Sequence, residues 1–192
     1  MYLFVHEALK LPAKSYRLPA IYYMSVIKHS DQRVAVFIDT QNLYHSAKNL
    51  YNTKVNFGAI METAIGKRKL IRSIAYVITT EAGDETQFFE ALTKLGIETK
   101  TKDLQVFYGG AKKGDWDLGI AMDAIRLGHK VDSIILVSGD GDFKPVVNYL
   151  QQSLGCLVEV VAFKKTTNKE LIEIADDYIN IEDNARKLLF RI

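Results

Sequence analysis

Residues 134–143 read I-I-L-V-S-G-D-G-D-F, a short apolar run that ends abruptly in small and acidic residues. Four consecutive apolar residues are typical of a strand buried on both faces of a sheet. Gly139 and Gly141 let the backbone bend after the strand. An amphipathic stretch at 143–154 then predicts a helix that ends at Gly155. A buried strand that turns directly into a helix is the repeating unit of a parallel α/β sheet.

The same alternation of strand and helix extends along most of the chain. Periodicity predicts further strands at 33–38, 73–79, 97–108, 157–163 and 178–181. It predicts further helices at 42–51, 57–65, 85–95, 117–127, 169–175 and 182–191. The pattern favours one α/β fold, a three-layer α/β/α sandwich around a central, mostly parallel sheet. Ligands of such sheets bind beyond the carboxyl ends of the strands, so the residues just after each strand are candidates for function.

The length of 192 residues fits one ordinary domain. We assign residues 31–192 to this domain and residues 1–30 to an N-terminal arm. Met24 lies just before the first clear strand, so residues 1–23 are either an extension upstream of the true start or an arm that packs on the domain. The first apolar run is too short, and precedes the basic residues, which argues against a signal peptide.

Composition excludes several other classes of protein. No apolar run approaches the roughly 18 residues that a membrane span needs. Cys156 is the single cysteine, which rules out an intrachain disulfide and suits a reducing compartment, so we expect a cytoplasmic protein. The formal net charge of +2 is nearly balanced, and any nucleic-acid binding must therefore come from local patches.

Acidic residues follow two of the predicted strands, and another begins the helix predicted at 117–127. Asp39 ends the first strand, Asp140 and Asp142 occupy the Gly-rich turn, and Asp117 opens the helix at 117–127. Each acid alone has a structural explanation as a helix cap or a first-turn charge. In a parallel sheet, however, at least three of them meet at one edge. Clustered carboxylates need a cation, and an all-oxygen ligand set favours Mg²⁺ or Mn²⁺, which can activate water for attack on a phosphate.

Three motifs resemble those of the NYN domains, in particular the LabA-like group of the PIN-like nuclease superfamily. They are F-I-D-T-Q-N-L at 37–43, K-G-D-W-D-L-G-I-A-M-D at 113–123 and S-G-D-G-D-F at 138–143. The resemblance spans roughly residues 33–181 and implies a metal-dependent ribonuclease on a parallel α/β/α sandwich. It implies four metal-binding, catalytic acids: Asp39, Asp117, Asp140 and Asp142.

The resemblance also implies roles for neighbouring residues. Asn42 and Ser138 become supporting polar groups at the substrate, and Asp123 becomes an outer or additional acid. The first motif departs from the family at Thr40, where glycine is common, and this adds a side chain beside the site.

Basic residues gather at the same predicted edge, where they could hold a phosphate backbone without reading its sequence. Lys113 and Lys144 are the main candidates for substrate binding, and the others are Lys112, Lys164 and Lys165. A second basic run at 67–72 belongs to the opposite edge, and we interpret it as solvated surface.

Other motifs fail on inspection. The stretch G-G-A-K-K-G at 109–114 is not a P-loop, because Asp115 stands where the lysine is required. The histidines lack metal-ligand spacing, and His45 is interpreted as a surface or packing residue. Trp116 is interpreted as packing rather than base stacking, and Cys156 as buried and inert.

The sequence therefore predicts a Mg²⁺- or Mn²⁺-dependent endoribonuclease. The alternative is a catalytically weak NYN-type module that binds RNA or regulates. A phosphatase-like enzyme is a third reading, which Gln41 disfavours because an acid is usual two residues after the nucleophilic aspartate. RNA is the expected partner, a membrane is not, and a homo-oligomer is compatible with the sequence.

Overall fold

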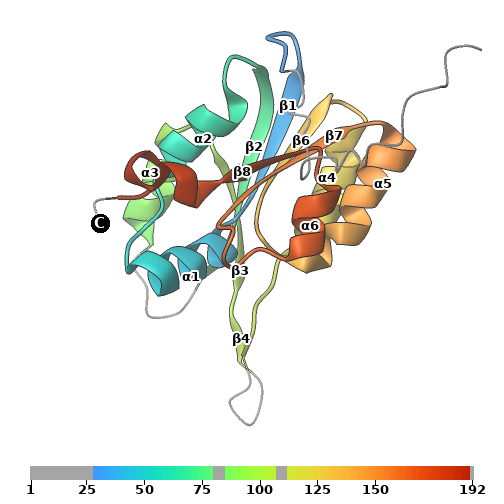
Figure 1. The fold of residues 1–192 in the computed structure, drawn as a ribbon. Helices are drawn as coiled ribbons and strands as arrows, with labels where there is room; N and C mark the ends of the chain where they lie inside the picture. Colours follow the sequence, from blue (N-terminus) through green and yellow to red (C-terminus); the bar gives the residue numbers. More distant parts are fainter. Residues whose placement is uncertain (1–27, 80–84, 107–111, 191–192) are drawn as a thin grey trace, which may run out of the picture.

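Six parallel strands form the central sheet of the protein (Figure 1). The computed structural model describes residues 28–79, 85–106 and 112–190. The strands are β1 (Arg33–Asp39), β2 (Lys69–Thr79), β3 (Glu98–Asp103), β6 (Ser133–Val137), β7 (Leu157–Ala162) and β8 (Asp177–Asn180). They lie in the order β3-β2-β1-β6-β7-β8, so the strand order reverses between β1 and β6. The predicted mostly parallel α/β/α sandwich is confirmed.

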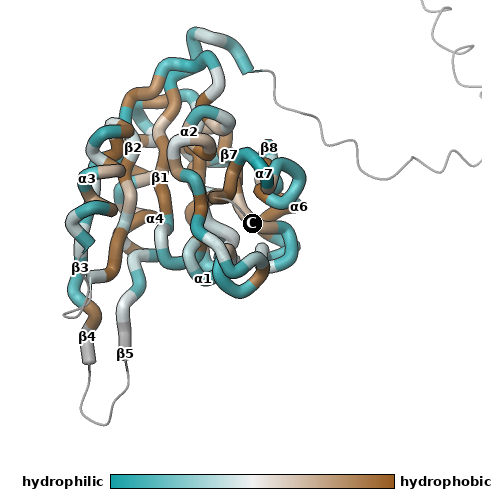
Figure 2. The backbone as a smooth tube through the Cα atoms, turned by 90° about the vertical axis from the view of Figure 1, so that its left-hand side faces the viewer, coloured by the Kyte–Doolittle hydropathy of each residue, from teal (hydrophilic) through white to brown (hydrophobic). Residues whose placement is uncertain are grey.

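Helices cover both faces of this sheet. One face packs against α1 (Thr40–Tyr51), α2 (Phe57–Ile65), α3 (Thr86–Lys94) and α7 (Ala185–Leu188). The other packs against α4 (Asp117–Gly128), α5 (Lys144–Leu154) and α6 (Lys169–Ile174). Val36 of β1 belongs to the first core and its neighbour Phe37 to the second, and both are fully buried. Burial on both faces explains why the central strands are continuously apolar (Figure 2).

The predicted strand at 97–108 is shorter in the structure and continues into a separate ribbon. After β3 the chain enters β4 (Gln105–Val106), which pairs antiparallel with β5 (Lys112–Lys113). Figures 1 and 2 both show this ribbon projecting beyond the carboxyl edge of the sheet, beside β3. Residues 107–111 lie outside the described part of the chain.

The C-terminal helix predicted at 182–191 is also shorter. The segment begins as the 3-10 helix η2 (Ile181–Asn184) and continues as α7, which ends at Leu188. Leu189 is extended and forms an isolated bridge with Val55. This pairing takes the end of the chain out of the helix. A further 3-10 turn, η1 (Gly141–Phe143), precedes α5.

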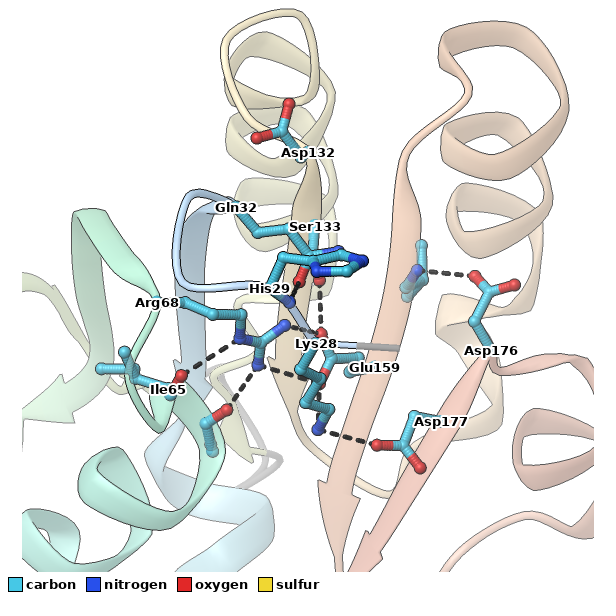
Figure 3. A network of polar contacts seen from close by, with 12 residues as sticks. Lys28, His29, Gln32, Ile65, Arg68, Asp132, Ser133, Glu159, Asp176 and Asp177 are labelled. Atoms are coloured by element: carbon cyan, nitrogen blue, oxygen red, sulfur yellow. Dashed lines mark hydrogen bonds and ion pairs between the residues drawn. The ribbon is translucent and has the colours of Figure 1, made fainter. Parts of the chain in front are cut away.

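The basic run at 67–72 was predicted to be solvated, and this is wrong for Arg68. Its guanidinium is buried and bonds both carboxylate oxygens of Glu159, from Nη1 to Oε1 and, at 3.0 Å, from Nη2 to Oε2 (Figure 3). The other basic residues of the run, Lys67, Lys69 and Arg72, are exposed. The sequence shows Glu159 as the one charged residue of a buried strand, but its partner lies 91 positions away and sequence patterns do not identify it.

Lys28 joins the end of the N-terminal arm to the same buried carboxylate. Its Nζ lies 2.7 Å from Glu159 Oε2 and 2.8 Å from Asp177 Oδ2. Ser133 donates a further hydrogen bond of 2.6 Å to Glu159. Burial alone would raise the pKa of Glu159, but the hydrogen bonds from Arg68, Lys28 and Ser133 outweigh it and hold the pKa below its usual value. Residues 1–27 of the predicted arm, including Met24, lie outside the described part.

Across the described ranges, the structure contains no helix that is long and apolar enough to cross a membrane.

Candidate functional site

A cavity of about 150 Å³ opens at the carboxyl edge of the sheet, where the strand order reverses. The end of β1, the start of α1, the carboxyl half of β2, the start of α4 with the residues before it, and the turn after β6 contribute to it. The lining residues are Asp39, Gln41, Asn42, Tyr76, Asp115, Trp116, Asp117 and Asp140. Three of the four predicted acids therefore meet in one cavity. The fourth, Asp142, is exposed and does not line it.

A larger hollow of about 370 Å³ lies on the outside of α3. Its lining comes from successive turns of this one helix: Thr86, Phe89, Glu90, Thr93 and Lys94. Functional groups from different elements do not converge there, so the acid-lined cavity is the better candidate site.

Asp39 is held in place by hydrogen bonds to both of its carboxylate oxygens. Oδ1 accepts the backbone N–H of Asn42 at 3.1 Å, which caps α1, and Oδ2 accepts the hydroxyl of Ser138 at 3.0 Å. Burial raises the pKa of Asp39, the two hydrogen bonds oppose this, and the nearby charge of Asp140 raises it further. The residue is thus both a helix cap and a partly buried acid whose orientation is fixed.

The turn after β6 is bonded to the start of α1. Asn42 Oδ1 accepts the N–H of Gly139 at 3.0 Å, and Asp140 donates its own N–H to Ser138 Oγ at 3.3 Å. Asp140 Oδ1 in turn accepts the N–H of Asp142 at 2.9 Å, which caps η1. Asn42 and Ser138 therefore connect the acids of the two central strands.

Glycine is required in this turn because another loop packs closely against it. A Cβ at Gly139 would lie 2.7 Å from Thr167 Oγ1 and 3.1 Å from its Cα. A Cβ at Gly141 would lie 2.5 Å from the side-chain nitrogen of Asn168. The loop before α6 thus supports the acidic turn from behind, and close packing rather than a positive φ explains the two glycines.

Asp117 carries the clearest electrostatic sign of the cluster. Burial and, in decreasing order, the carboxylates of Asp140, Asp39, Asp115 and Asp142 together raise its pKa to about 6. The lining residues include no lysine or arginine. Negative charge in the cavity is therefore not neutralised by any side chain that lines it.

The donor set of the cavity fits a hydrated divalent cation. In the part of the chain that the structure describes, no three His, Cys, Asp or Glu side chains lie close enough together to ligate one ion directly. Mg²⁺ usually retains several waters and binds through one or two carboxylates. Asp39, Asp117 and Asp140 supply hard oxygen donors of this kind, and their mutual repulsion favours a cation between them.

Two aromatic residues form the wall of the cavity next to β3. The Trp116 indole donates its N–H to the carbonyl of Val77 at 3.0 Å and lies edge-on to Tyr76 with 5.3 Å between ring centroids. It also covers Gly119, where a Cβ would lie 2.6 Å from the indole ring. These contacts agree with the packing interpretation of Trp116. The sequence alone did not reveal Tyr76, because its place at the site follows from its pairing with Asp39 across β1 and β2.

Asp123, expected as an outer acid, does not line the cavity but bonds a residue that does. Its Oδ2 accepts the Tyr76 hydroxyl at 2.7 Å and Lys100 Nζ at 2.5 Å. Burial would raise the pKa of Asp123, but the hydrogen bonds from Lys100 and Tyr76 outweigh it and lower the pKa. Thr40, the departure from the family motif, is buried and donates its hydroxyl to the Tyr76 carbonyl at 2.6 Å. Its side chain thus connects the start of α1 to β2.

The lysines expected to bind phosphate differ in whether their charge is paired with a carboxylate. Lys144 forms an ion pair with Glu170, and Lys165 lies 3.2 Å from a carboxylate oxygen of Glu182. Lys164 is exposed. Lys112 and Lys113 form β5, but their side chains lie outside the described part of the structure.

Asp115 and Gln41 line the cavity although the sequence did not single them out as site residues. Asp115 stands two residues before Asp117 in the second motif, which was the available signal. His45 is exposed and lies edge-on to Tyr44. Cys156 is buried as expected, and burial raises its thiol pKa.

The chain is similar to known proteins over most of its length. The chain is 25% identical over 162 residues to the low amplitude and bright protein LabA of Synechococcus elongatus, covering 79% of this chain and 84% of that protein. It is also similar to a crystal structure of a protein of unknown function from Vibrio parahaemolyticus, with a TM-score of 0.77 and 31% identity over 85% of this chain and 99% of the other. The family model described as the NYN domain matches residues 33–182, and the chain belongs to the NYN domain family.

Proposed function

We propose that the protein is a metal-dependent endoribonuclease that hydrolyses RNA phosphodiester bonds at the acid-lined cavity. The observation that carries the proposal is the meeting of Asp39, Asp117 and Asp140 in one cavity with no basic side chain in its lining. Membership of the NYN family, which belongs to the PIN-like nuclease superfamily, supports the reaction class.

Mg²⁺ or Mn²⁺ is the cofactor that we propose for this cavity. Asp39, Asp117 and Asp140 would hold it, and Asp142 adds negative charge from the rim. Such an ion supplies a Lewis acid for a phosphate oxygen and lowers the pKa of a bound water. The acids are suited to this role because they are preorganised, so little rearrangement is needed when the phosphate arrives.

Asn42 and Ser138 are best explained as residues that position the acids. Ser138 fixes one oxygen of Asp39, and Asn42 holds the backbone that carries Asp140. The bond to Gly139 uses the carbonyl oxygen of the Asn42 side chain, which leaves its NH₂ group for a substrate oxygen. A carboxylate oxygen that accepts one hydrogen bond also retains a second lone pair for a metal-bound water.

The test is cleavage of mixed RNA and DNA oligomers in Mg²⁺, in Mn²⁺ and in chelator. We expect RNA fragments with either metal and none with chelator. Asp39→Asn and Asp140→Asn should each abolish cleavage, because asparagine keeps the cap but loses the charge. Lys130→Ala, at the opposite edge of the sheet, serves as the matched control. Cleavage that persists in both acid variants, with a mock preparation inactive, would contradict the assignment of the active site.

A second candidate is a module that binds RNA and cleaves it weakly or not at all. The observation that favours it is the spacing of the acids, since no three of the described acidic residues reach one ion directly. RNA binding in chelator without fragments in either metal would identify this case.

A further inference from the structure

The lysines near the cavity differ in how their charge is neutralised. On the side of α5 and α6, Lys144 pairs with Glu170 and Lys165 with Glu182. On the side of β3, Lys100 pairs with Asp123. These pairs lower the attraction that the lysines can offer to a phosphate.

Lys102 on β3 lies at the rim of the cavity without such a pair. Its Nζ donates to the backbone carbonyl of Asp115 at 3.3 Å and lies 5.9 Å from the centroid of the Trp116 ring. Asp115 and Trp116 both line the cavity. Within residues 28–79, 85–106 and 112–190, no carboxylate forms an ion pair with Lys102, and its side chain is exposed. The ammonium group is thus a cation held beside the acids.

The surface beneath Lys102 is rigid. Trp116 is fixed by its bond to Val77, by the edge of Tyr76 and by the close approach of Gly119. A cation over an indole face is attracted by the electron density of the ring, so the Lys102 ammonium is favoured in this position. Less side-chain freedom is then lost when an anion binds to it.

Charge explains why the site needs such a group. A cavity lined with carboxylates repels a phosphodiester chain, and a cation at its rim offsets that repulsion for the phosphates on either side of the scissile one. The β4–β5 ribbon continues from β3 beyond the carboxyl edge, so the surface on this side of the cavity extends outward (Figures 1 and 2).

We propose that Lys102, held over Trp116, binds a phosphate next to the scissile one and directs the RNA strand across the cavity towards β3 rather than towards α5 and α6. The inference rests on the proposed ribonuclease function and assigns the path of its substrate. Lys102 takes the place of Lys144 as the principal phosphate contact at the cavity. Its role is to bind and position the strand, and it takes no part in the bond exchange.

The experiment measures binding of a single-stranded RNA oligomer as a function of salt in chelator, where cleavage cannot interfere. A single phosphate contact contributes about 0.7 to the slope of log K against log salt for single strands. Lys102→Ala should therefore flatten the slope by about 0.7, which corresponds to about a fivefold loss of affinity at 0.1 M relative to 1 M salt. Lys102→Arg should restore most of the slope.

Two control variants each remove the positive charge of a lysine at another position. Lys144→Ala tests the opposite side of the cavity, and Lys130→Ala, which follows α4, tests the opposite edge of the sheet. Both should keep the wild-type slope. In Mn²⁺, Lys102→Ala should raise KM for RNA and leave kcat within about twofold, as expected of a group that binds substrate and transition state alike.

The outcomes separate this inference from the proposed function. If the wild type and Lys102→Ala show the same salt slope, the proposed strand path is wrong and the nuclease proposal is unaffected. The same holds if Lys144→Ala flattens the slope and Lys102→Ala does not. A wild type that neither binds nor cleaves RNA overturns both proposals.

Discussion

The charge state of Asp117 is the most informative property at the residue scale. An acid with a raised pKa holds its proton longer in the folded protein than in the unfolded chain. The contribution of Asp117 to stability is then greatest at low pH and falls as pH rises from 3.8, the ordinary pKa of an aspartate, through about 6. At neutral pH, the ionised Asp117 therefore lowers the stability of the folded protein, because it lies among other carboxylates.

This leads to a prediction for Asp117→Asn. Without metal, the stability of the variant should decline less than that of the wild type between about pH 4 and pH 6, because the variant has no carboxyl group with a raised pKa at this position. Urea unfolding at several pH values measures it. An identical pH profile in wild type and variant would show that Asp117 is not held among unneutralised acids.

The sequence identified most of the acids at the cavity, together with Asn42 and Ser138 beside them, but not Tyr76 or Lys102. Asp39 and Asp140 follow from the rule that ligands bind beyond the carboxyl ends of strands, and Asp117 from its place in the second motif at the start of a helix. Tyr76 has no such signal, since its place depends on the pairing of β1 with β2. Lys102 likewise looks like any exposed charge on a polar strand until Trp116 is placed beneath it.

At the element scale, the strands differ in how much of their environment the sequence reveals. The central strands β1 and β6 are buried on both faces, and a continuous apolar run is a strong signal. β2 begins four residues before its predicted start. In Lys69–Arg72 two apolar residues stand between two basic ones and all four are exposed, and a register shift opposite Val34 and Ala35 interrupts the alternation. β5 is too short for periodicity to predict, and β4 and α7 were predicted only as parts of the longer segments at 97–108 and 182–191.

The buried ion pair at the amino edge of the sheet gives a prediction at this scale. Arg68→Met leaves the fully buried carboxylate of Glu159 with only Lys28 and Ser133 as partners, which should cost up to about 3–5 kcal/mol. Lys28→Ala should cost about 1 kcal/mol or less, since this lysine is partly exposed and Arg68 remains. Both values come from urea unfolding.

The double variant Arg68→Met, Glu159→Leu provides the control, because it removes both charges together. It should recover much of the loss. Equal, small losses in Arg68→Met and Lys28→Ala would show that Glu159 does not depend on the guanidinium.

For the whole molecule, metal binding should act on stability by mass action. An ion that binds only the folded state at 100 times its Kd adds about 2.7 kcal/mol. For a domain of this size, each 1 kcal/mol raises Tm by about 2–4 °C. Saturating Mn²⁺ should therefore raise Tm by about 5–10 °C in the wild type and by much less in Asp140→Asn. The same rise in both proteins would remove Asp140 from the metal site.

The central pairing of the sheet has a consequence for folding kinetics. β1 pairs with β6, and the register joins Val34 to Ser133, residues 99 positions apart, because 133 − 34 = 99. The hydrogen bond between Ser138 and Asp39 spans the same distance along the chain. Contacts of high sequence separation form slowly, because the entropy cost of closing a long loop comes before the favourable energy of the contacts. The cavity therefore cannot assemble from any local fragment, and a nascent chain acquires it only after residue 140 has been synthesised and the two halves of the sheet have met.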